Sequence, residues 1–345
     1  MDARSPEGPT LVTDHETVAS VLDVWFRDET VAWHTPHVFR AILAELRRRH
    51  PQVVFHAIDP RSLGLPKETL EWQGSPASSH MMRLVHPPSG AHSVISFWDN
   101  NYAPLMRHMG WEPALLRQLI ATSGISEAGY EGNRHQLAES RPLQAFHVPF
   151  TYNIFRLPDY ARIEEQRTQT APLARRSPEL CFRGFLYELR TEILAQLPRD
   201  LVRVYDARRD GSLEPAEYLA ELAAHQMGFS LNGAGEICNR DMEILGLGIP
   251  LFRPELHCQF HEPLIPDVHY VRACRAPEVA VSGTFRFLNP RDAADEMVSN
   301  YARWQREPEA LEQIGRNGRA WFERNVLLER QAALACDLLD LALLH

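Results

Sequence analysis

The sequence predicts an α/β protein, and the clearest signal is a doubly wound parallel sheet in its second half. From residue 179 onward, short apolar runs alternate with stretches of helical periodicity, and Pro215 stands in the first turn of one such helix. A repeated strand–helix unit packs most simply as a parallel sheet with helices on both faces. The predicted strands are 179–182, 201–205, 229–231 and 249–252, and the predicted helices are 187–197, 215–227 and 240–245.

The first half also alternates between strand and helix patterns, but less regularly. We expect helices over 16–50 and 104–120, strands over 53–58 and 93–98, and a strand or loop over 145–151. Residues 156–178 are polar, without apolar periodicity, which is typical of an interdomain linker. The tail is helical from Arg291, with an interruption near Pro308. The expected units are an N-terminal acceptor-side domain (1–155), a linker (156–178), a C-terminal domain (179–330) and a terminal helix (331–345).

Composition places the chain among soluble globular proteins, with 345 residues, 44% of them hydrophobic and 23% charged. The net charge of −9 disfavours binding to nucleic acid through phosphate neutralisation. Residues 1–13 are polar, and no window approaches the roughly 18 apolar residues of a membrane span, so we expect a cytoplasmic protein without a membrane span. The five cysteines are scattered, with no Cys-x-x-Cys pair, and are expected to be reduced.

A glycine loop, Asn232-Gly-Ala-Gly235, lies between a predicted strand and a predicted helix. Gly233 and Gly235 allow backbone N–H groups to approach an anion at the start of that helix. Arg240 and Glu243 follow three residues apart, so they share one helix face. A guanidinium suits a diphosphate, and a carboxylate can accept hydrogen bonds from both hydroxyls of a ribose. A tight turn followed by a solvated arginine is the alternative interpretation.

A second turn of the same kind follows the strand at 179–182. In Phe182-Arg-Gly184, Gly184 permits close backbone approach, and Arg183 is positioned as a second cation for a diphosphate, with Arg190 behind it. We expect Gly184, Arg190 and Asn232 to belong to the same ligand-binding site. Both turns fall where the strands of an open α/β sheet end, which is where such sheets bind ligands. A surface arginine beside a turn glycine is the simpler alternative.

Metal motifs are incomplete in this sequence. Residues 206–217 match a calcium-binding loop at several positions, but Arg208 stands where calcium needs an oxygen ligand. His257, Cys258 and His261 lack a fourth ligand at a standard zinc spacing. No Asp-x-Asp pair is present to hold a metal against a diphosphate. We therefore predict no metal and no cofactor, with arginines and helix dipoles stabilising a leaving diphosphate.

The best candidate for a general base is Asp99, directly after the predicted strand 93–98. His34, Asp59 and His147 are further candidates in the first half. Each of these residue types also serves as a cap, a turn residue or a core residue, and that interpretation stays open.

Taken together, the second half resembles the C-terminal half of GT-B glycosyltransferases, with the closest likeness to exostosin-like proteins and to the capsule-associated, protein O-glucosyltransferase-like group. The resemblance covers about residues 179 to 335 and depends on the order and spacing of short motifs. These are Phe182-Arg-Gly184 with Arg190, Tyr218–Leu222, Phe229–Asn232, Gly235, Arg240–Glu243, Gly248–Pro250, Pro266–Val271 and Ile314–Phe322.

The resemblance implies two Rossmann-like domains that face a cleft, closed by C-terminal helices. It implies that Arg183 and Arg240 bind the diphosphate of a sugar nucleotide, that Gly233 and Gly235 admit it, and that Glu243 holds the ribose or the sugar. The expected activity is metal-independent transfer of a hexosyl or related group from a nucleotide-diphosphate sugar to an acceptor hydroxyl. That acceptor would be a small molecule, a glycan or a protein.

Two other functions are compatible with this sequence. One is a non-catalytic sugar-nucleotide-binding or interaction protein of the same fold. The other is a glycosyltransferase that acts on modified DNA bases, which the net charge of −9 disfavours.

Overall fold

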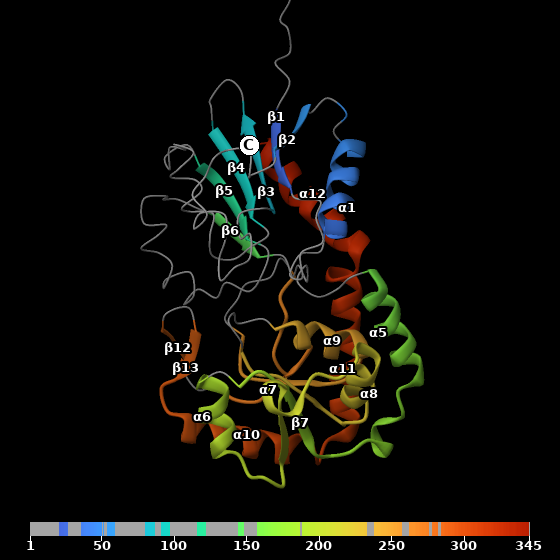
Figure 1. Cartoon of the computed structure of the whole chain (residues 1–345), viewed down its shortest axis with the longest axis vertical. Coiled ribbons are helices and arrows are strands. Elements are labelled where there is room, and N and C mark those ends of the chain that lie inside the picture. Colours follow the sequence, from blue (N-terminus) through green and yellow to red (C-terminus); the bar gives the residue numbers. More distant parts are fainter. Residues whose placement is uncertain are drawn as a thin grey trace, which may run out of the picture.

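The structure is a computed structural model in which the chain forms two bodies, one around each sheet system (Figure 1). No helix in the part of the chain that the structure describes is both long and apolar enough to cross a membrane. The described residues are 21–26, 36–49, 51, 54–58, 80–86, 91–96, 116–121, 144–147, 157–186, 188–232, 238–256, 262–275, 278–281 and 284–344.

A six-stranded sheet forms the N-terminal body, in the order β2-β1-β3-β4-β5-β6. β3 runs antiparallel to both of its neighbours, whereas the other neighbouring pairs are parallel, so the sheet is mixed and not an all-parallel Rossmann-like sheet. The strands are β1 (Val21–Phe26), β2 (Val54–Ile58), β3 (His80–His86), β4 (Ala91–Ser96), β5 (Leu116–Ala121) and β6 (Gln144–His147).

Two helix predictions in the first half are wrong in part. Within the expected helix 16–50, residues 21–26 form β1, and only Pro36–Arg49 forms helix α1. Residues 116–121, at the end of the expected helix 104–120, form β5. Both segments are apolar and lie between two other strands, and this pairing outweighs their helical spacing. The strands predicted over 53–58 and 93–98 are confirmed as β2 and β4, and β6 falls at the start of 145–151.

The C-terminal body contains the predicted parallel strands. β7 (Leu180–Gly184) pairs with β8 (Val202–Asp206), and β10 (Leu251–Arg253) pairs with β9 (Gly228–Phe229) and β11 (Val271–Arg272), all in parallel. β7 lies next to β9, and a parallel bridge between Ser177 and His225 joins the segments that lead into them. The two-stranded sheet β8-β7 therefore lies beside the three-stranded sheet β9-β10-β11, which gives the spatial order β8-β7-β9-β10-β11.

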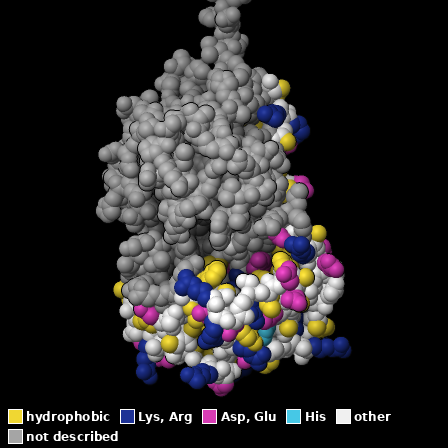
Figure 2. All heavy atoms as spheres, in the orientation of Figure 1, with side chains coloured by type: hydrophobic (Ala, Val, Ile, Leu, Met, Phe, Trp, Pro, Cys, Tyr) yellow, Lys and Arg dark blue, Asp and Glu magenta, His cyan; other side chains and the backbone are white. Residues whose placement is uncertain are grey.

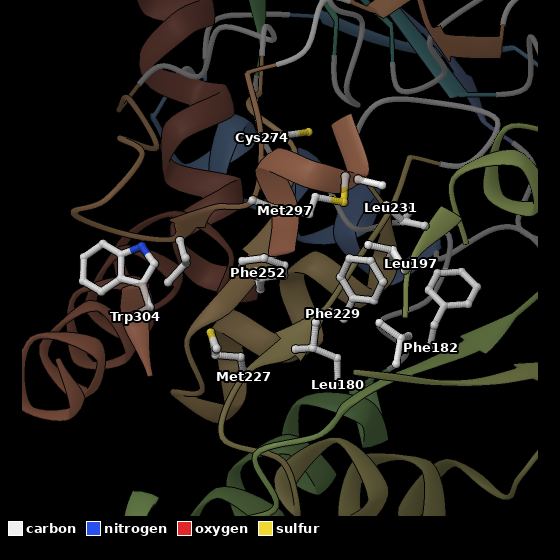
Figure 3. Close-up of a cluster of buried hydrophobic side chains, with 14 of the residues drawn as sticks. Leu180, Phe182, Leu197, Met227, Phe229, Leu231, Phe252, Cys274, Met297 and Trp304 are labelled. Carbon is white, nitrogen blue, oxygen red and sulfur yellow. The ribbon is translucent and has the colours of Figure 1, made fainter. Parts of the chain in front are cut away.

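A row of aromatic rings crosses this sheet and confirms the order. Phe182 of β7 contacts Phe229 of β9 at 6.1 Å between ring centroids, and Phe229 contacts Phe252 of β10 at 5.9 Å. All three side chains are buried, together with Leu180, Leu197, Met227 and Leu231 (Figure 3). Tyr301 continues the row from helix α10 (Pro290–Trp304), at 6.2 Å from Phe252. Aromatic packing of this kind adds to the free energy of burial and fixes the relative positions of the strands.

The helices between these strands lie where the sequence predicts them. They are α6 (Glu188–Gln196), α8 (Pro215–Ala223) and α9 (Asn239–Leu247), with a single short turn, α7 (Ala207–Asp210), after β8. α9 ends at Gly248, whose φ of 71° is left-handed, a conformation that favours glycine.

Within the predicted linker 156–178, residues Leu157–Gln169 form helix α5, which the polar sequence did not indicate. α5 packs against α8 and α9, and its Ile163 is buried in their apolar cluster. Tyr160 lies one turn before Ile163 and packs against the same cluster, so a narrow apolar stripe is enough to dock this otherwise polar helix.

Three helices form the tail, as the sequence predicts: α10 (Pro290–Trp304), α11 (Pro308–Asn325) and α12 (Leu328–Leu344). The interruption expected near Pro308 falls between α10 and α11. A two-stranded hairpin, β12 (Glu278–Val281) with β13 (Thr284–Phe287), precedes them. α12 packs against α1 of the N-terminal body (Figure 1). Arg49 of α1 and Asp337 of α12 form an ion pair at 2.6 Å.

Candidate functional site

The candidate site lies where β7 and β9 end side by side. The chain leaves β7 toward β8 on one side and later returns to β9 on the other, so this edge is the switch point of the sheet, where open α/β sheets bind ligands. Arg183 and Gly184 end β7, Asn232 follows β9, and Arg240 lies in the first turn of α9. The predicted ligand-binding residues that the structure describes in the C-terminal body therefore lie along one edge.

Arg240 is partly buried and is held on three sides. Its Nε group donates a hydrogen bond of 2.9 Å to the Tyr218 hydroxyl, and its guanidinium lies 4.4 Å from the centroid of the Phe182 ring. A Cβ atom added at Gly184 would lie 3.0 Å from its Nη2 atom. Neither Nη group donates a hydrogen bond to any residue in the described part of the chain. Among the described residues, therefore, nothing occupies the parallel N–H donors that an oxyanion would use.

Glu243 lies on the same face of α9, one turn after Arg240. Burial raises the pKa of its carboxyl to about 7 against the opposing effects of Arg240 and of a hydrogen bond with Tyr218. The nearby carboxylates of Asp159 and Asp241 also raise this pKa. A carboxyl whose pKa is raised to about 7, beside a guanidinium whose two Nη groups donate to no described residue, is the kind of perturbed pair that clusters at functional sites.

Arg183 is committed to a carboxylate. Its Nε and Nη2 atoms donate to the two carboxylate oxygens of Glu221 on α8, at 2.7 and 2.8 Å, and its guanidinium stacks 4.0 Å from the centroid of the Tyr205 ring. This bidentate geometry is the one that a diphosphate would also use. An anion at this edge can therefore bind Arg183 only if the guanidinium contacts the anion and Glu221 at the same time.

Arg190 and Asn232 belong to the support of the glycine loop. Arg190 is 8% exposed, and it donates to the carbonyl oxygens of Asn232 (2.8 Å), Leu231 (3.1 Å) and Phe185 (3.0 Å). Asn232 is 1% exposed, and its side-chain oxygen accepts a hydrogen bond of 2.7 Å from Arg253. These two predicted binding residues hold the end of β9 in place through backbone and side-chain contacts.

A buried ion pair that the sequence analysis missed completes this support. Arg253, the last residue of β10, donates through Nη1 to Asp241 on α9, and both side chains are essentially inaccessible to solvent. Asp241 also accepts a hydrogen bond of 2.7 Å from the backbone N–H of Cys238, which caps the start of α9. The network therefore ties the end of β9, the end of β10 and the start of α9 together. Only the capping position of Asp241, three residues after Cys238, is visible as a local sequence signal.

Several predicted residues lie outside the described residues. They are Gly233, Gly235, Asp99, the other candidate bases His34 and Asp59, and the cluster of His257, Cys258 and His261. For His147 the structure describes the backbone, in β6, and not the side chain. Their roles stay predictions.

Within the described residues, no group of three or more His, Cys, Asp or Glu side chains could hold a metal ion. The rejected calcium loop is the end of β8 followed by α7, where Asp210 pairs with Arg209 at 2.9 Å. On the face shown in Figure 2, basic and acidic side chains of the described residues are mixed, without a stripe of one sign. This surface does not resemble a phosphate-backbone footprint.

The charge of the site itself is positive. The guanidinium groups of Arg240 and Arg190 lie close to Gly184, and Arg183 precedes it in β7. Glu221, paired with Arg183, and Glu243, whose pKa is raised to about 7, oppose this positive charge. The N-terminus of α9 adds the partial positive charge of the helix dipole. This arrangement can bind an anionic ligand that also carries hydroxyl groups.

No protein-family model matches this chain, and no curated protein matches it. Solved structures show a weak likeness. The GtfA/B complex has 15% sequence identity and a TM-score of 0.40 over 70% of this chain and 48% of that chain, so this chain spans about half of its length. Anabaena HepE in complex with UDP-glucose has 12% identity and a TM-score of 0.40, over 92% of this chain and 99% of that one.

The pneumococcal O-GlcNAc transferase GtfA in complex with UDP and GlcNAc has 9% identity and a TM-score of 0.31, over 79% of this chain and 66% of that one. Likenesses at this level assign neither a shared fold nor a function. The chemistry of the site therefore rests on its own residues.

Proposed function

We propose that this protein is a glycosyltransferase that moves a sugar from a nucleotide-diphosphate donor to an acceptor hydroxyl without a metal ion. The observation that carries the proposal is Arg240, whose Nε is anchored on Tyr218 while its two Nη groups have no hydrogen-bond partner among the described residues. A fixed guanidinium with two parallel donors matches the oxygens of a diphosphate.

The neighbours of Arg240 support a nucleotide in preference to a simple phosphate. Glu243 lies one helical turn away, at a distance suited to ribose hydroxyls when Arg240 contacts the diphosphate. Gly184 leaves space for the guanidinium, and the start of α9 faces the same edge. In this proposal the arginine and the helix dipole stabilise the leaving diphosphate, which is the task that a metal performs in other transferases.

Donor binding tests the proposal directly. Thermal-shift screening against UDP-, GDP- and TDP-sugars identifies a ligand, because a molecule that binds only the folded state raises the melting temperature. Calorimetry with that nucleotide diphosphate should then show binding to the wild type and none to Arg240→Ala. Unchanged binding by Arg240→Ala contradicts the assigned site.

Arg303→Ala is the matched control, because Arg303 is an exposed arginine on α10 that stacks on Trp304 at 4.8 Å. It should bind like the wild type.

Slow hydrolysis of the bound donor by the wild type separates an enzyme from a binding protein of the same fold. A protein that binds the donor and never cleaves or transfers it fits the binding-protein alternative.

A further inference from the structure

The hydroxyl of Tyr218 lies between the two side chains to which donor binding is assigned. Tyr218 belongs to α8, whereas Arg240 and Glu243 belong to α9. Nε of Arg240 donates to the hydroxyl at 2.9 Å. The hydroxyl also interacts with the Glu243 carboxyl, and this interaction lowers the pKa of Glu243. The hydroxyl oxygen of Tyr218, on α8, thus contacts both Arg240 and Glu243 of α9.

The chemistry of the three groups gives these hydrogen bonds a direction. A guanidinium can only donate, so the hydroxyl oxygen accepts from Nε–H of Arg240. The single hydroxyl proton is then available to the carboxylate of Glu243. Burial raises the pKa of Tyr218, so this proton stays in place at neutral pH. From donor to acceptor, the interactions therefore run from Arg240 to Tyr218 and from Tyr218 to Glu243.

We propose that Tyr218 is a positioning residue of the donor site. Its hydroxyl fixes Nε of Arg240, which aims both Nη groups at the diphosphate, and it orients the Glu243 carboxylate toward the ribose hydroxyls. The inference rests on the proposed function and adds a residue that touches neither diphosphate nor ribose. It also links nucleotide binding to the ionisation of Glu243.

The charged and titratable groups around Glu243 come from each helix packed against α9. Arg240 and Asp241 lie on α9 itself, Tyr218 on α8 and Asp159 on α5. From α11, Arg319 donates to the carbonyl oxygen of Gly246, near the other end of α9, and from β10, Arg253 is paired with Asp241. Tyr218 is the group in this set that hydrogen-bonds both Arg240 and Glu243.

Donor affinity should follow the protonation state of Glu243. A carboxylate that accepts ribose hydroxyls has a lower pKa in the complex than in the free protein, so affinity is highest above the free pKa of about 7 and falls as pH drops through it. In Tyr218→Phe the carboxylate loses a hydrogen bond that lowers its pKa, so the midpoint of this fall should move to higher pH.

The experiment is calorimetry from about pH 6 to about pH 8.5 with UDP-, GDP- and TDP-glucose, which lack the terminal phosphate that titrates near pH 6 in free nucleoside diphosphates. Tyr218→Phe removes one oxygen atom and should weaken binding by about tenfold at the upper end of this range, together with the shifted midpoint. Glu243→Gln, which cannot titrate, should show no such pH dependence.

Tyr301→Phe is the matched control, because its hydroxyl also donates one hydrogen bond, to the Pro178 carbonyl, but lies on α10. It should match the wild type in affinity and pH profile. Tyr218→Phe with wild-type affinity overturns the inference, and so does weaker binding with an unchanged midpoint, which would mark a merely structural hydroxyl. If the wild type binds none of the probes, the proposed function fails and the inference fails with it.

Discussion

Gly184 makes room for the guanidinium of Arg240, because a Cβ atom at position 184 would lie only 3.0 Å from Nη2. Gly184 does not have a positive φ, so alanine is compatible with its backbone conformation. The contact is with the far end of a flexible side chain, which can move away at low cost. Gly184→Ala should therefore fold normally and displace the guanidinium from its position over Phe182.

We expect Gly184→Ala to weaken nucleotide-diphosphate binding by about tenfold, with little change in melting temperature, since the loss is one charge-assisted contact. Calorimetry on Gly184→Ala, Arg240→Ala and the double variant checks this. The double variant should bind no worse than Arg240→Ala alone, because the glycine acts through the arginine. Additive losses would mean that Gly184 contacts the ligand independently.

Arg183 should contribute more to folding than to donor binding. Its bidentate bond to Glu221 is mostly buried, so Arg183→Ala leaves a carboxylate without its partner and should lower the free energy of unfolding by about 2 kcal/mol. Arg183→Ala/Glu221→Ala should recover part of that loss in urea denaturation. Arg183→Ala should also weaken donor binding less than Arg240→Ala does. A larger binding loss would show that the ligand takes Arg183 from Glu221.

The buried pair of Arg253 and Asp241 should be strongly coupled. Arg253→Met leaves Asp241 charged and without a cation in a site closed to solvent, which costs about 3–5 kcal/mol. Arg253→Met/Asp241→Leu removes both charges and should be more stable than Arg253→Met alone, as measured by urea unfolding. Equal stability of the single and double variants would argue against an uncompensated buried charge as the cause.

Glu243 should make the protein less stable as pH rises. Its pKa is raised from 4.5 to about 7 on folding, so its contribution is fully present below about pH 4.5 and is lost as pH rises through 7. Glu243→Gln should therefore gain stability relative to the wild type between about pH 5 and about pH 8, by at most about 3 kcal/mol. Melting curves of Glu243→Gln and the wild type at both pH values test the direction of this change. A stability difference between the two proteins that stays the same at both pH values would contradict the raised pKa.

The strands and helices of the second half could be predicted because their signals are local. The apolar runs at 201–205 and 249–252 are bounded by turn residues, and β8 and β10 lie within two residues of these expectations. Arg240 and Glu243 could be placed on one face from spacing alone. The helix predicted over 16–50 was wrong at β1 for a physical reason. Apolar residues there have helical spacing, at Val18, Val21, Leu22 and Trp25. The segment nevertheless forms a strand, because β2 and β3 pair with it on both sides.

The support of the site could not be predicted from the sequence. Arg253 and Asp241 are twelve residues apart on different elements, and only the folded sheet brings them together. Arg190 was expected to face a ligand, but the carbonyl oxygens of Leu231 and Asn232 take its donors. Whether an arginine is free or engaged depends on such long-range partners, which a motif does not contain.

The packing of α12 against α1 has a consequence for how the chain is made. During synthesis, the segments that form the six-stranded sheet leave the ribosome first, but the helix that covers α1 spans Leu328–Leu344 and leaves more than 270 residues after α1. Domains generally fold in the order in which they emerge. Here the earlier body stays incomplete until the later one has been translated, so the side of α1 that contacts α12 is exposed during most of elongation. A ribosome-bound chain should therefore depend on chaperones for longer than its domain order suggests.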